Sequence, residues 1–595
     1  MHRALRHSRL AEHLAGLFDA TDQDVLAEIE AHAEWLTLAG GETLFHRGDP
    51  GDAAYVIISG RLRILDGARA VNEAGAGETL GEMALLSGEP RSATVLAVRD
   101  SLLARLPSAA FNRLVHDHPS ILRHIAGILV RRLRSATASP ARMRAGMRTL
   151  AVLAVDGSAA TAAFTRRLVA ALEAHGATLH LDAAAVDRAL GRAGSAACAD
   201  GDEGSVPLVE WLNEQELRHR FVVYEAAANA RWVERALRQA DHVLLVAAAG
   251  AKALDRELVG RPRSAHAPRA SLVVVRPAHA ERPAGTARLL DACRVDAHYH
   301  VAMDSGADFA RLARCLAGAG VGLVLGGGGA RGFAHLGVLR ALAEAGVPVD
   351  WVGGTSIGAI IAALVAQDVP HDEAAARCRR HFRELRDPTL PLVALLAGRR
   401  IRARLEDAFG EVAIEDLPLP YLCVSTNLTR AAQAVHERGP VVRAVRASIS
   451  VPGILPPMRL DADLHVDGGL VNNLPIDVMV AKPEIGAVIA VDVGGEQDMA
   501  APPGFEPELS GWQVLWNRLA KRARPPTMMS VITRSSFVAS IHWARERHTA
   551  EQASLYLRIP VADLRLLAFE RIDDIAARGY DATREAIGRW WAGRG

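Results

Sequence analysis

Two glycine-dense turns, each following an apolar strand and opening a helix, constrain this chain more than any other feature. The first turn, GGGGARG, spans residues 326–332, and the second, GTSIG, spans residues 354–358. Consecutive glycines let several backbone N–H groups converge on one anion, and a sharp strand-to-helix turn can hold a serine hydroxyl exposed. Together the two turns indicate acyl transfer.

Length and composition restrict the class of protein. A chain of 595 residues is too long for one core, so about three domains are expected. Lys and Arg number 69 and Asp and Glu 68, so no overall field favours nucleic acid as a partner. The N-terminus lacks a signal-peptide pattern, and no stretch reaches the roughly 18 apolar residues of a membrane span. We therefore expect a soluble, cytoplasmic protein.

The cysteines carry no evident chemistry. They are odd in number and form no CxxC pair, so neither a disulfide framework nor a zinc or other metal site is predicted. They are Cys198, Cys293, Cys315, Cys378 and Cys423.

The first domain is predicted at residues 1–140. Short apolar strands separated by glycine turns, typical of a small β-barrel or jelly roll, run from about residue 35 to 106. From Ser108 to about Arg134 the apolar spacing becomes helical. Six arginines then surround a linker-like segment, which indicates a solvated linker or, alternatively, a contact with an anionic membrane. They are Arg131, Arg132, Arg134, Arg142, Arg144 and Arg148.

An α/β domain is predicted at residues 141–318. Strand-like runs at residues 149–155, 242–248 and 271–277 alternate with helical ones, which favours a parallel sheet. The first turn, beginning at Asp156, follows a strand as a phosphate loop would, but it lacks the Gly-Lys-Ser/Thr ending. Nucleotide hydrolysis is not expected there.

The third predicted domain, residues 319–595, holds the motifs between about residues 321 and 485. Strand and helix patterns alternate again from Val321 onward, and the last 95 residues indicate a mostly helical, irregular elaboration.

Ser356 is the candidate nucleophile of this domain. A serine hydroxyl becomes a useful nucleophile only when it is held rigidly and its proton has an acceptor. Gly354 and Gly358 leave room for the tight turn, and the following helix directs its N-terminus at the serine.

The first glycine turn is the candidate oxyanion site. Gly327, Gly328 and Gly329 can direct backbone N–H groups toward one point, and Arg331 adds a positive charge beside them. The same turn also spells GxGxxG, the pattern of dinucleotide loops. The acid that a ribose would need about 20 residues later is Asp350, at the start of the strand before the serine, so dinucleotide binding is disfavoured.

Asp467 is the candidate base. It follows a short strand in LHVDGGLVNNLP and opens a turn with Gly468 and Gly469, so its carboxylate can be presented at the end of the sheet. An Asp-Gly pair is also common in hairpin turns. The two preceding glycine motifs in the same domain favour the catalytic interpretation.

These three motifs together resemble the patatin-like phospholipases. That family has a GGGxRG loop, which here ends at Gly332, then a GxSxG elbow and a late Asp-Gly-Gly or Asp-Gly-Ala. The resemblance implies a three-layer α/β hydrolase with a mostly parallel sheet and a Ser–Asp dyad in place of a triad. Ser356 would be the nucleophile, Asp467 the base, and the loop glycines the oxyanion donors, with Arg331 supporting them.

A Ser–His–Asp hydrolase is the rival interpretation and would need a histidine. His335 lies on the helix after the glycine loop, where a packed helix residue is the simpler interpretation. His465 precedes Asp467 by two residues and shares its face of the strand, so it could approach the site.

A second functional segment lies in the first domain, in GEMALL (residues 81–86) and PRSATV (residues 90–95). An acid, a short helical turn and an arginine beside a small residue form a compact cradle for a ribose and a phosphate. The segment resembles the phosphate-binding cassette of cyclic-nucleotide-binding domains. The resemblance implies that Glu82 meets the ribose, and Arg91 and Ser92 the cyclic phosphate, of cAMP or cGMP, with Gly81 in the same cradle. Such a nucleotide would be a regulator, because the expected catalysis needs no cofactor. The fold of cyclic-nucleotide-binding domains often persists where affinity for the ligand is lost.

The order of the three domains resembles the neuropathy target esterase family, whose members hydrolyse phospholipids and lysophospholipids. The resemblance runs from about residue 40 to the C-terminus. From the sequence we expect one nucleotide-binding module and no N-terminal membrane anchor like that of the animal members, which leaves membrane attachment open.

The segment GWQVLWNRLAKRARPP could lie at a lipid surface. Trp512, Leu515, Trp516 and Leu519 fall on one face of a helix, and basic side chains cover the rest. Tryptophan beside basic residues is the composition of an interfacial helix, and an ordinary helix packed on the domain is the alternative.

The motifs and the resemblances together predict a serine esterase, a lysophospholipase or phospholipase, that acts on carboxylic esters of lipids through an acyl-enzyme. A cyclic nucleotide is its expected regulator. Because its substrate is a lipid, we also expect the protein to make peripheral contact with a membrane. The alternative is a non-catalytic nucleotide sensor or scaffold on the same fold. A transcription factor is disfavoured because no helix-turn-helix pattern follows the β-domain.

Overall fold

The computed structural model describes residues 31–117, 149–494 and 549–594, with short gaps. The gaps are positions 68, 158–160, 200, 201, 203, 228, 261–266, 280, 383, 384 and 386; residues 510, 531, 532, 535, 538, 540 and 542 are also described. The arginine-rich linker around Arg142 and the predicted interfacial helix around Trp512 lie outside the described residues. The chain divides into two compact units, Met1–Val275 with Leu290–His298, and Arg276–Leu289 with Tyr299–Gly595.

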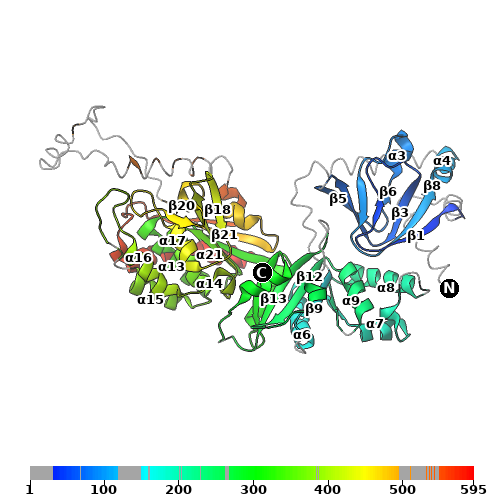
Figure 1. Cartoon of the computed structure of the whole chain (residues 1–595), viewed down its shortest axis with the longest axis horizontal. Coiled ribbons are helices and arrows are strands. Elements are labelled where there is room, and N and C mark those ends of the chain that lie inside the picture. The colour runs from blue at the N-terminus through cyan, green and yellow to red at the C-terminus, as the bar shows by residue number, and fades with distance from the viewer. Residues whose placement is uncertain are drawn as a thin grey trace. The chain divides into compact units, whose positions relative to one another are not determined.

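The N-terminal part of the first unit is a β-roll of two antiparallel sheets, which confirms the predicted fold (Figure 1). One sheet has the order β1-β8-β3-β6 and the other β2-β7-β4-β5. The elements are β1 (Glu34–Leu38), β2 (Thr43–Phe45), β3 (Ala53–Ser59), β4 (Arg61–Asp66), β5 (Arg69–Gly75), β6 (Thr79–Leu80), α3 (Glu82–Ser87), β7 (Thr94–Ala97), β8 (Ser101–Pro107) and α4 (Ser108–Asp117).

Strand β3 is buried along its whole length because both of its faces are covered. Tyr55 and Ile57 point into the core between the two sheets. Val56 and Ile58 point the other way, into a second core that contains Phe111 of α4. Alternate residues of a strand face opposite sides, so a strand buried on both sides reads as a continuous apolar run.

The C-terminal part of the first unit is built on a sheet of order β10-β11-β9-β12-β13-β14, in which β14 continues into residues assigned to the second unit. The pairs β10–β11, β11–β9, β9–β12 and β12–β13 are parallel, as the alternating strand and helix patterns predict. The strands are β9 (Thr149–Ala154), β10 (Thr178–Leu181), β11 (Phe221–Glu225), β12 (His242–Ala248), β13 (Arg269–Arg276) and β14 (Ala297–Ala302). The helices are α6 (Thr161–Leu172), α7 (Ala183–Leu190), α8 (Ser205–Arg218), α9 (Ala230–Gln239), α10 (Arg256–Val259) and α11 (Thr286–Cys293).

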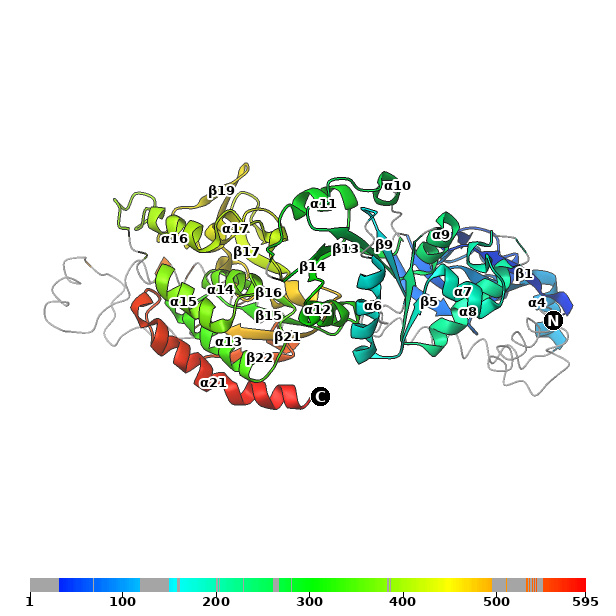
Figure 2. The same ribbon diagram turned by 90° about the horizontal axis from the view of Figure 1, so that it is seen from below.

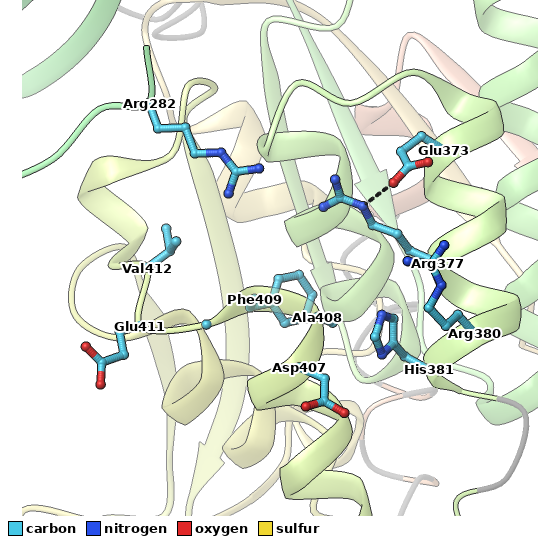
Figure 3. Close-up of a pocket in the computed structure, with 11 residues that line it drawn as sticks. Arg282, Glu373, Arg377, Arg380, His381, Asp407, Ala408, Phe409, Glu411 and Val412 are labelled. Carbon is cyan, nitrogen blue, oxygen red and sulfur yellow. Dashed lines mark hydrogen bonds and ion pairs between the residues drawn. The ribbon is translucent and has the colours of Figure 1, made fainter. Parts of the chain in front are cut away.

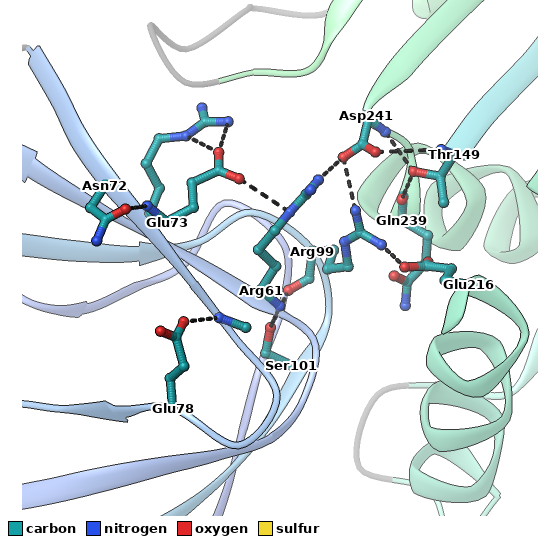
Figure 4. A network of polar contacts seen from close by, with 12 residues as sticks. Arg61, Asn72, Glu73, Glu78, Arg99, Ser101, Thr149, Glu216, Gln239 and Asp241 are labelled. Atoms are coloured by element: carbon teal, nitrogen blue, oxygen red, sulfur yellow. Dashed lines mark hydrogen bonds and ion pairs between the residues drawn. The ribbon is translucent and has the colours of Figure 1, made fainter. Parts of the chain in front are cut away.

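Buried ion pairs join the β-roll to this parallel sheet inside the first unit (Figure 4). Arg99, in the turn before β8, pairs with Glu216 of α8 and with Asp241 at 2.8 Å. The adjacent Asp100 accepts a hydrogen bond from Nη1 of Arg235 on α9 at 2.7 Å. All of these charges except that of Asp241 are almost fully buried, and a buried charge is tolerated only when it is paired and hydrogen-bonded. The seam therefore holds the two parts together through specific geometry.

The second unit is built on a mostly parallel sheet of order β19-β20-β17-β16-β15-β21-β22, with β18 also paired to β17. Strands β17, β16, β15, β21 and β22 run parallel, and β18, β19 and β20 add antiparallel pairs. The strands are β15 (Gly320–Leu325), β16 (Trp351–Thr355), β17 (Tyr421–Asn427), β18 (Ala432–His436), β19 (Met458–Leu460), β20 (Asp463–Asp467), β21 (Ile485–Asp492) and β22 (Leu555–Arg558). The expectation of a mostly helical C-terminal region missed β22, whose four residues are too few for a clear pattern.

Helices pack on this sheet and complete the predicted three-layer α/β fold. They are α12 (Gly306–Leu316), α13 (Ala334–Glu344), α14 (Ile357–Ala366), α15 (His371–His381), α16 (Arg399–Phe409), α17 (Val441–Ser448), α18 (Ile476–Val480) and α21 (Ile572–Ala592). Leu323 and Leu325 of β15 enter the large core under α13 and α14. Helix α21 lies alongside α13 (Figure 2). In the part of the chain that the structure describes, no helix is long and apolar enough to cross a membrane.

Candidate active site

Ser356 lies on the sharp turn between β16 and α14. Its φ of 56° and ψ of −127° form a conformation that residues with a side chain rarely adopt, so the surrounding structure must hold it there. The backbone N–H of Ser356 donates a hydrogen bond to Oγ of Ser448 at 2.9 Å. The side chain is buried except for 8% of its surface, at the N-terminus of α14. The turn thus has the nucleophile-elbow geometry.

The glycines around this elbow are needed because the backbones approach very closely. A Cβ on Gly358 would lie 2.1 Å from the carbonyl oxygen of Leu325. A Cβ on Gly354 would lie 2.6 Å from the carbonyl carbon of Gly358, and one on Gly332 would lie 2.2 Å from Cγ2 of Ile357. No side chain fits at these positions, so β15, β16 and α14 can meet only through glycine.

Asp467 ends β20 and is completely buried. Its Oδ1 accepts a hydrogen bond from the N–H of Gly469 at 2.8 Å. Burial raises the pKa of the carboxyl from 3.8 to about 6, against the opposing effects of hydrogen bonding from the Ser356 hydroxyl and the Gly469 amide. Oδ2 is buried and makes no fully formed hydrogen bond with any described residue. Asp467 is therefore a carboxyl close to Ser356 that can gain or lose a proton near neutral pH. Hydrogen bonds between a catalytic base and its nucleophile often shorten only when substrate is bound.

The glycine loop faces the serine but does not use all of its amides there. A Cβ on Gly327 would lie 3.0 Å from Cβ of Ser356, so the loop passes directly beside the nucleophile. The N–H of Gly327 is occupied by the carbonyl oxygen of Asn473 at 3.2 Å, contrary to its expected role as a donor. For the N–H groups of Gly328 and Gly329, no acceptor is found among the described residues. These two amides are the ones left to meet an oxyanion.

Arg331 fastens this loop to the C-terminal part of the chain. Its Nε donates to the carbonyl oxygen of Leu564 at 2.8 Å, and its Nη2 donates to that of Ala562 at 2.9 Å. Burial lowers the pKa of the guanidinium. The side chain therefore anchors the loop to the C-terminal part of the chain, and its charge is bonded to backbone carbonyl oxygens rather than left unpaired beside the reacting atoms.

Neither candidate histidine contacts the serine. His335 is fully buried on α13, its Nε2 is 2.9 Å from the carbonyl oxygen of Gly326, and burial lowers its pKa to about 4. It is a packed helix residue, as expected. His465 lies on β20 with its Nδ1 2.8 Å from Oγ of Ser425, which also contacts His436. No described contact joins His465 to Ser356 or Asp467.

Asp350, the acid that a dinucleotide would need, is unavailable. It is fully buried and accepts hydrogen bonds from Nη2 of Arg314 at 2.7 Å and from the N–H of Val321 at 2.9 Å. This carboxylate organises the start of the sheet, so the glycine loop lacks a ribose partner at that position.

The cassette residues of the β-roll lie together, with the arginine largely held by the protein. Gly81 has φ of 80° and precedes α3, whose first residue, Glu82, is buried. Arg91 is 3% exposed and donates to the carbonyl oxygen of Gly81 and to Oδ1 of Asp52, each at 2.9 Å. Its Nε is buried and has no acceptor among the described residues. Ser92 is exposed beside it.

A separate hollow of about 410 Å³ lies at the C-terminal ends of α15 and α16 (Figure 3). Charged residues line it, and Nε of Arg377 is paired with Glu373 at 2.8 Å. Neither Ser356 nor Asp467 is among its lining residues, so it is not the candidate active site.

One group of described side chains has spacing suited to a metal ion. Ligand atoms of His279, Asp308 and Asp368 lie within 4.8 Å of one another. Arg311 already pairs with Asp308 at 3.1 Å and lies 3.6 Å from Asp368. The guanidinium of Arg311 thus already neutralises these carboxylates, and the group is better described as an ion-pair cluster than as a metal site.

Two positioning residues escaped the sequence interpretation. Ser448 holds the backbone of Ser356, and Asn473 bonds both backbone groups of Gly327, with its Nδ2 3.1 Å from the carbonyl oxygen. Asn473 belongs to the NNLP segment that begins three residues after Gly469 of the Asp-Gly-Gly turn, so its place in the sequence was a usable signal. Ser448 ends a helix and carries no motif.

Three family models match the chain. A patatin-like phospholipase model matches residues 323–480, a cyclic nucleotide-binding domain model matches residues 35–118, and a neuropathy target esterase family P-loop like domain model matches residues 146–307. The P-loop-like match covers the segment in which we expect no nucleotide hydrolysis, and that expectation stays a prediction.

Curated proteins match along nearly the whole chain. Lysophospholipase NTE1 of Mycosarcoma maydis is 31% identical over 95% of this chain and 34% of that protein. Patatin-like phospholipase domain-containing protein 6 of Homo sapiens is 32% identical over 94% of this chain and 45% of that protein. The chain therefore spans less than half the length of these relatives. Among solved structures, the Thermus thermophilus catabolite activator protein is 30% identical over 20% of this chain and 59% of that chain, with a TM-score of 0.19.

Proposed function

The chain belongs to the neuropathy target esterase family of patatin-like phospholipases, and on that premise we propose that it is a serine lysophospholipase or phospholipase. The observation that carries the proposal is the pair of Ser356, held on a strained elbow, and Asp467, a buried carboxyl whose pKa burial raises to about 6. A rigid nucleophile beside a near-neutral base is what acyl transfer requires.

The reaction begins with the ionised Asp467 carboxylate. Asp467 accepts the proton of the Ser356 hydroxyl as Oγ attacks the ester carbonyl carbon of the lipid. The carbonyl oxygen becomes an oxyanion, and the N–H groups of Gly328 and Gly329 stabilise it because their orientation is fixed before the reaction. The tetrahedral intermediate expels the glycerol oxygen, which takes the proton from Asp467, and acyl-Ser356 remains.

Water completes the cycle. Asp467 is again a carboxylate, and it takes a proton from a water molecule that attacks the acyl-Ser356 carbonyl. The second tetrahedral intermediate breaks down to a fatty acid, and the proton returns from Asp467 to Oγ of Ser356. A single carboxyl thus acts as base and acid in both halves, so the reaction needs no histidine.

A substrate panel tests the proposed activity. The full chain is incubated with lysophospholipids, phospholipids and short-chain soluble esters, and products are identified by mass spectrometry. We expect free fatty acid, and its loss in Ser356→Ala and in Asp467→Asn but not in His465→Ala. The alternative of a non-catalytic sensor or scaffold would be supported if no ester in the panel is hydrolysed by the unmodified chain.

We also propose that the β-roll binds a cyclic nucleotide as a regulator. The buried Nε of Arg91, which has no acceptor among the described residues, supports this because a buried donor is costly unless something accepts from it. A cyclic phosphate at Gly81 and Arg91 would supply that acceptor. Calorimetric titration with cAMP and cGMP should give heat with the unmodified chain and none with Arg91→Leu. Absence of heat and of a thermal shift in the unmodified chain would contradict the proposal.

The ion-pair seam of the first unit offers a route for this regulation. Asp100 and Arg99 lie directly between β7, which follows the cassette, and β8. They are bonded to Arg235 and Asp241 of the α/β part. A shift of the β-roll on nucleotide binding would therefore be transmitted to α9 and β12 rather than absorbed by a flexible joint.

A further inference from the structure

An exposed apolar hairpin lies between α15 and α16. Pro388 and Leu396 form an antiparallel bridge, and the N–H of Thr389 donates to the carbonyl oxygen of Leu395 at 3.1 Å. The chain therefore reverses direction over residues 390–395, whose sequence is LPLVAL. We call these six residues the apolar tip.

The apolar tip is far more exposed than its composition would predict. Leu392 is 84% exposed, Leu390 73% and Val393 71%. Among the described residues, three of the four most exposed large hydrophobic side chains belong to this tip. Isolated exposed leucines are common, but a contiguous group marks a surface that is covered by something else in use.

The apolar tip is held in a fixed frame. The N–H groups of Leu395 and Leu396 donate to the carbonyl oxygens of Gly453 and Ile454, at 2.9 and 3.0 Å. The carboxylate of Asp387 accepts from the N–H groups of Gly398 and Arg400, at 3.2 and 3.0 Å, which closes the base of the hairpin. The leucines are thus presented to solvent by an ordered backbone.

Two arginines without side-chain partners follow the tip at the start of α16. Arg399 and Arg400 are exposed, and no described residue pairs with their guanidinium groups. Arg402, two residues later, is paired with Glu406 at 2.9 Å. Positive charge is unfavourable at a helix N-terminus, and α16 has no acid in its first turn. The two arginines are therefore positioned for an external anion beside the apolar tip.

The hairpin is connected to the candidate active site through one short segment. Residues 449–456 follow α17, and Leu395 of the tip and the adjacent Leu396 hydrogen-bond to Gly453 and Ile454 of that segment. Ser448, the last residue of α17, immediately precedes this segment and holds the backbone of Ser356; within the segment, the carbonyl oxygen of Ser450 accepts from the N–H of Asp467 at 2.9 Å. A surface that binds the hairpin would therefore lie close to the backbone segment that positions Ser356 and Asp467.

We propose that the apolar tip inserts into the surface of a lipid bilayer while Arg399 and Arg400 contact anionic headgroups. Apolar side chains bordered by basic ones fit the boundary between acyl chains and an anionic headgroup layer. This surface deepens the proposed function, on which it rests, because an esterase of aggregated lipids must meet its substrate at a bilayer.

Flotation with vesicles tests the surface directly. The full chain is mixed with vesicles of phosphatidylcholine, with and without phosphatidylserine, and the bound fraction is measured after centrifugation. We expect binding to the mixed vesicles and a loss of at least about tenfold in Leu392→Ser/Val393→Ser. Leu217→Ser is the matched control, because Leu217 is 74% exposed on α8 of the first unit and is not part of the hairpin, and this variant should bind as the unmodified chain does.

The charges have their own matched pair of variants. Arg399→Ala/Arg400→Ala should weaken binding to vesicles that contain phosphatidylserine by about tenfold and leave binding to pure phosphatidylcholine unchanged. Arg402→Ala should change neither, because Glu406 already occupies that arginine. Unfolding midpoints of all variants should match the unmodified chain, since the altered side chains are solvent-exposed.

The outcomes separate this proposal from the enzymatic one. Labelling of Ser356 by a fluorophosphonate, measured on the same samples, reports the proposed function independently of flotation. Labelled protein that does not float, or an apolar-tip variant that floats as well as the unmodified chain, overturns the lipid surface and leaves the esterase intact. A tip variant that changes the oligomeric state in light scattering, without changing flotation, would assign the tip to contacts between copies.

Discussion

The hydroxyl of Ser448 holds the backbone of Ser356 in place. Its Oγ accepts from the N–H of Ser356 at 2.9 Å and donates to the carbonyl oxygen of Val424 at 2.6 Å. A strained φ of 56° is thereby tied to the adjacent strand, and the Ser356 N–H is withdrawn from any role as an oxyanion donor.

Removing this tether should slow acylation more than it weakens the fold. In Ser448→Ala the buried N–H of Ser356 loses its acceptor, which costs about 1–3 kcal/mol, so we expect kcat to fall about 10- to 100-fold. Thr583→Ala is the control, because Thr583 also carries a buried hydroxyl, bonded to the carbonyl oxygen of Gly579 at 2.7 Å on α21. It should lose comparable stability and keep its rate; equal rates in the two variants would contradict the positioning role.

The activity should fall in acid with an apparent pKa of about 6. Asp467 must be ionised to accept the serine proton, and burial raises its pKa from 3.8 to about 6. The value of kcat/KM on a soluble ester should therefore decrease about tenfold for each pH unit below that point. The same acid limb should persist in His465→Ala, and a limb that disappears in that variant would assign the base to histidine.

Asp467→Asn should be inactive yet more stable at alkaline pH. A carboxyl whose folded pKa is raised contributes most to stability at low pH, and that contribution is lost as pH rises through about 6. The interval between 3.8 and about 6 corresponds to about 3 kcal/mol, which is the most that the variant can recover at pH 8. Urea unfolding should show the gain at pH 8 and little difference near pH 4. A variant less stable than the unmodified chain at pH 8 would contradict this account.

Gly329 should not tolerate a side chain. It has φ of 56°, and a Cβ there would lie 2.4 Å from the carbonyl oxygen of Leu566, so Gly329→Ala must displace the loop. We expect kcat to fall by about 100-fold or more because the oxyanion donors lose their alignment. Gly346→Ala is matched in backbone conformation, with φ of 66° and open space around it, and should cost only about 1–2 kcal/mol of stability. Similar activity in the two variants would contradict a role of the glycine loop in stabilising the oxyanion.

Asp100→Asn should destabilise the first unit strongly. It removes the carboxylate that the buried Arg235 shares with the partly exposed Arg238, and breaking a buried ion pair costs about 3–5 kcal/mol. Asp66→Asn, which removes an exposed partner of Arg47, should cost less than about 1 kcal/mol. Thermal unfolding followed by calorimetry compares the two, and equal midpoints would show that the seam contributes little.

The local parts of the candidate site were predictable because residues close together in the sequence determine their geometry. The elbow at Ser356 follows from two glycines four residues apart, and the turn at Asp467 from the two glycines after it. The strands of both α/β regions were predictable for the same reason, since apolar runs between turns need no distant partner.

The long-range parts were not predictable, because distant segments supply the partners. Arg331 is bonded to carbonyls of Leu564 and Ala562, more than 200 residues away, and Gly327 gives its N–H to Asn473. Nothing near Arg331 in the sequence indicates its bonds, and the place of Asn473 close to the Asp-Gly-Gly turn does not show that it binds Gly327. The exposure of the apolar tip at residues 390–395 likewise comes from the fold, because an apolar sequence such as LPLVAL does not by itself show whether it is exposed.

Mass-spectrometric mapping of a fluorophosphonate adduct tests the dyad most directly. The unmodified chain and Asp467→Asn are treated with the probe at pH 8, quenched at matched times and digested. We predict a single adduct on the peptide that contains Ser356, formed at least about 100-fold more slowly in Asp467→Asn. An adduct on another serine, or equal labelling of Ser356 in the two proteins, would contradict the Ser356–Asp467 dyad.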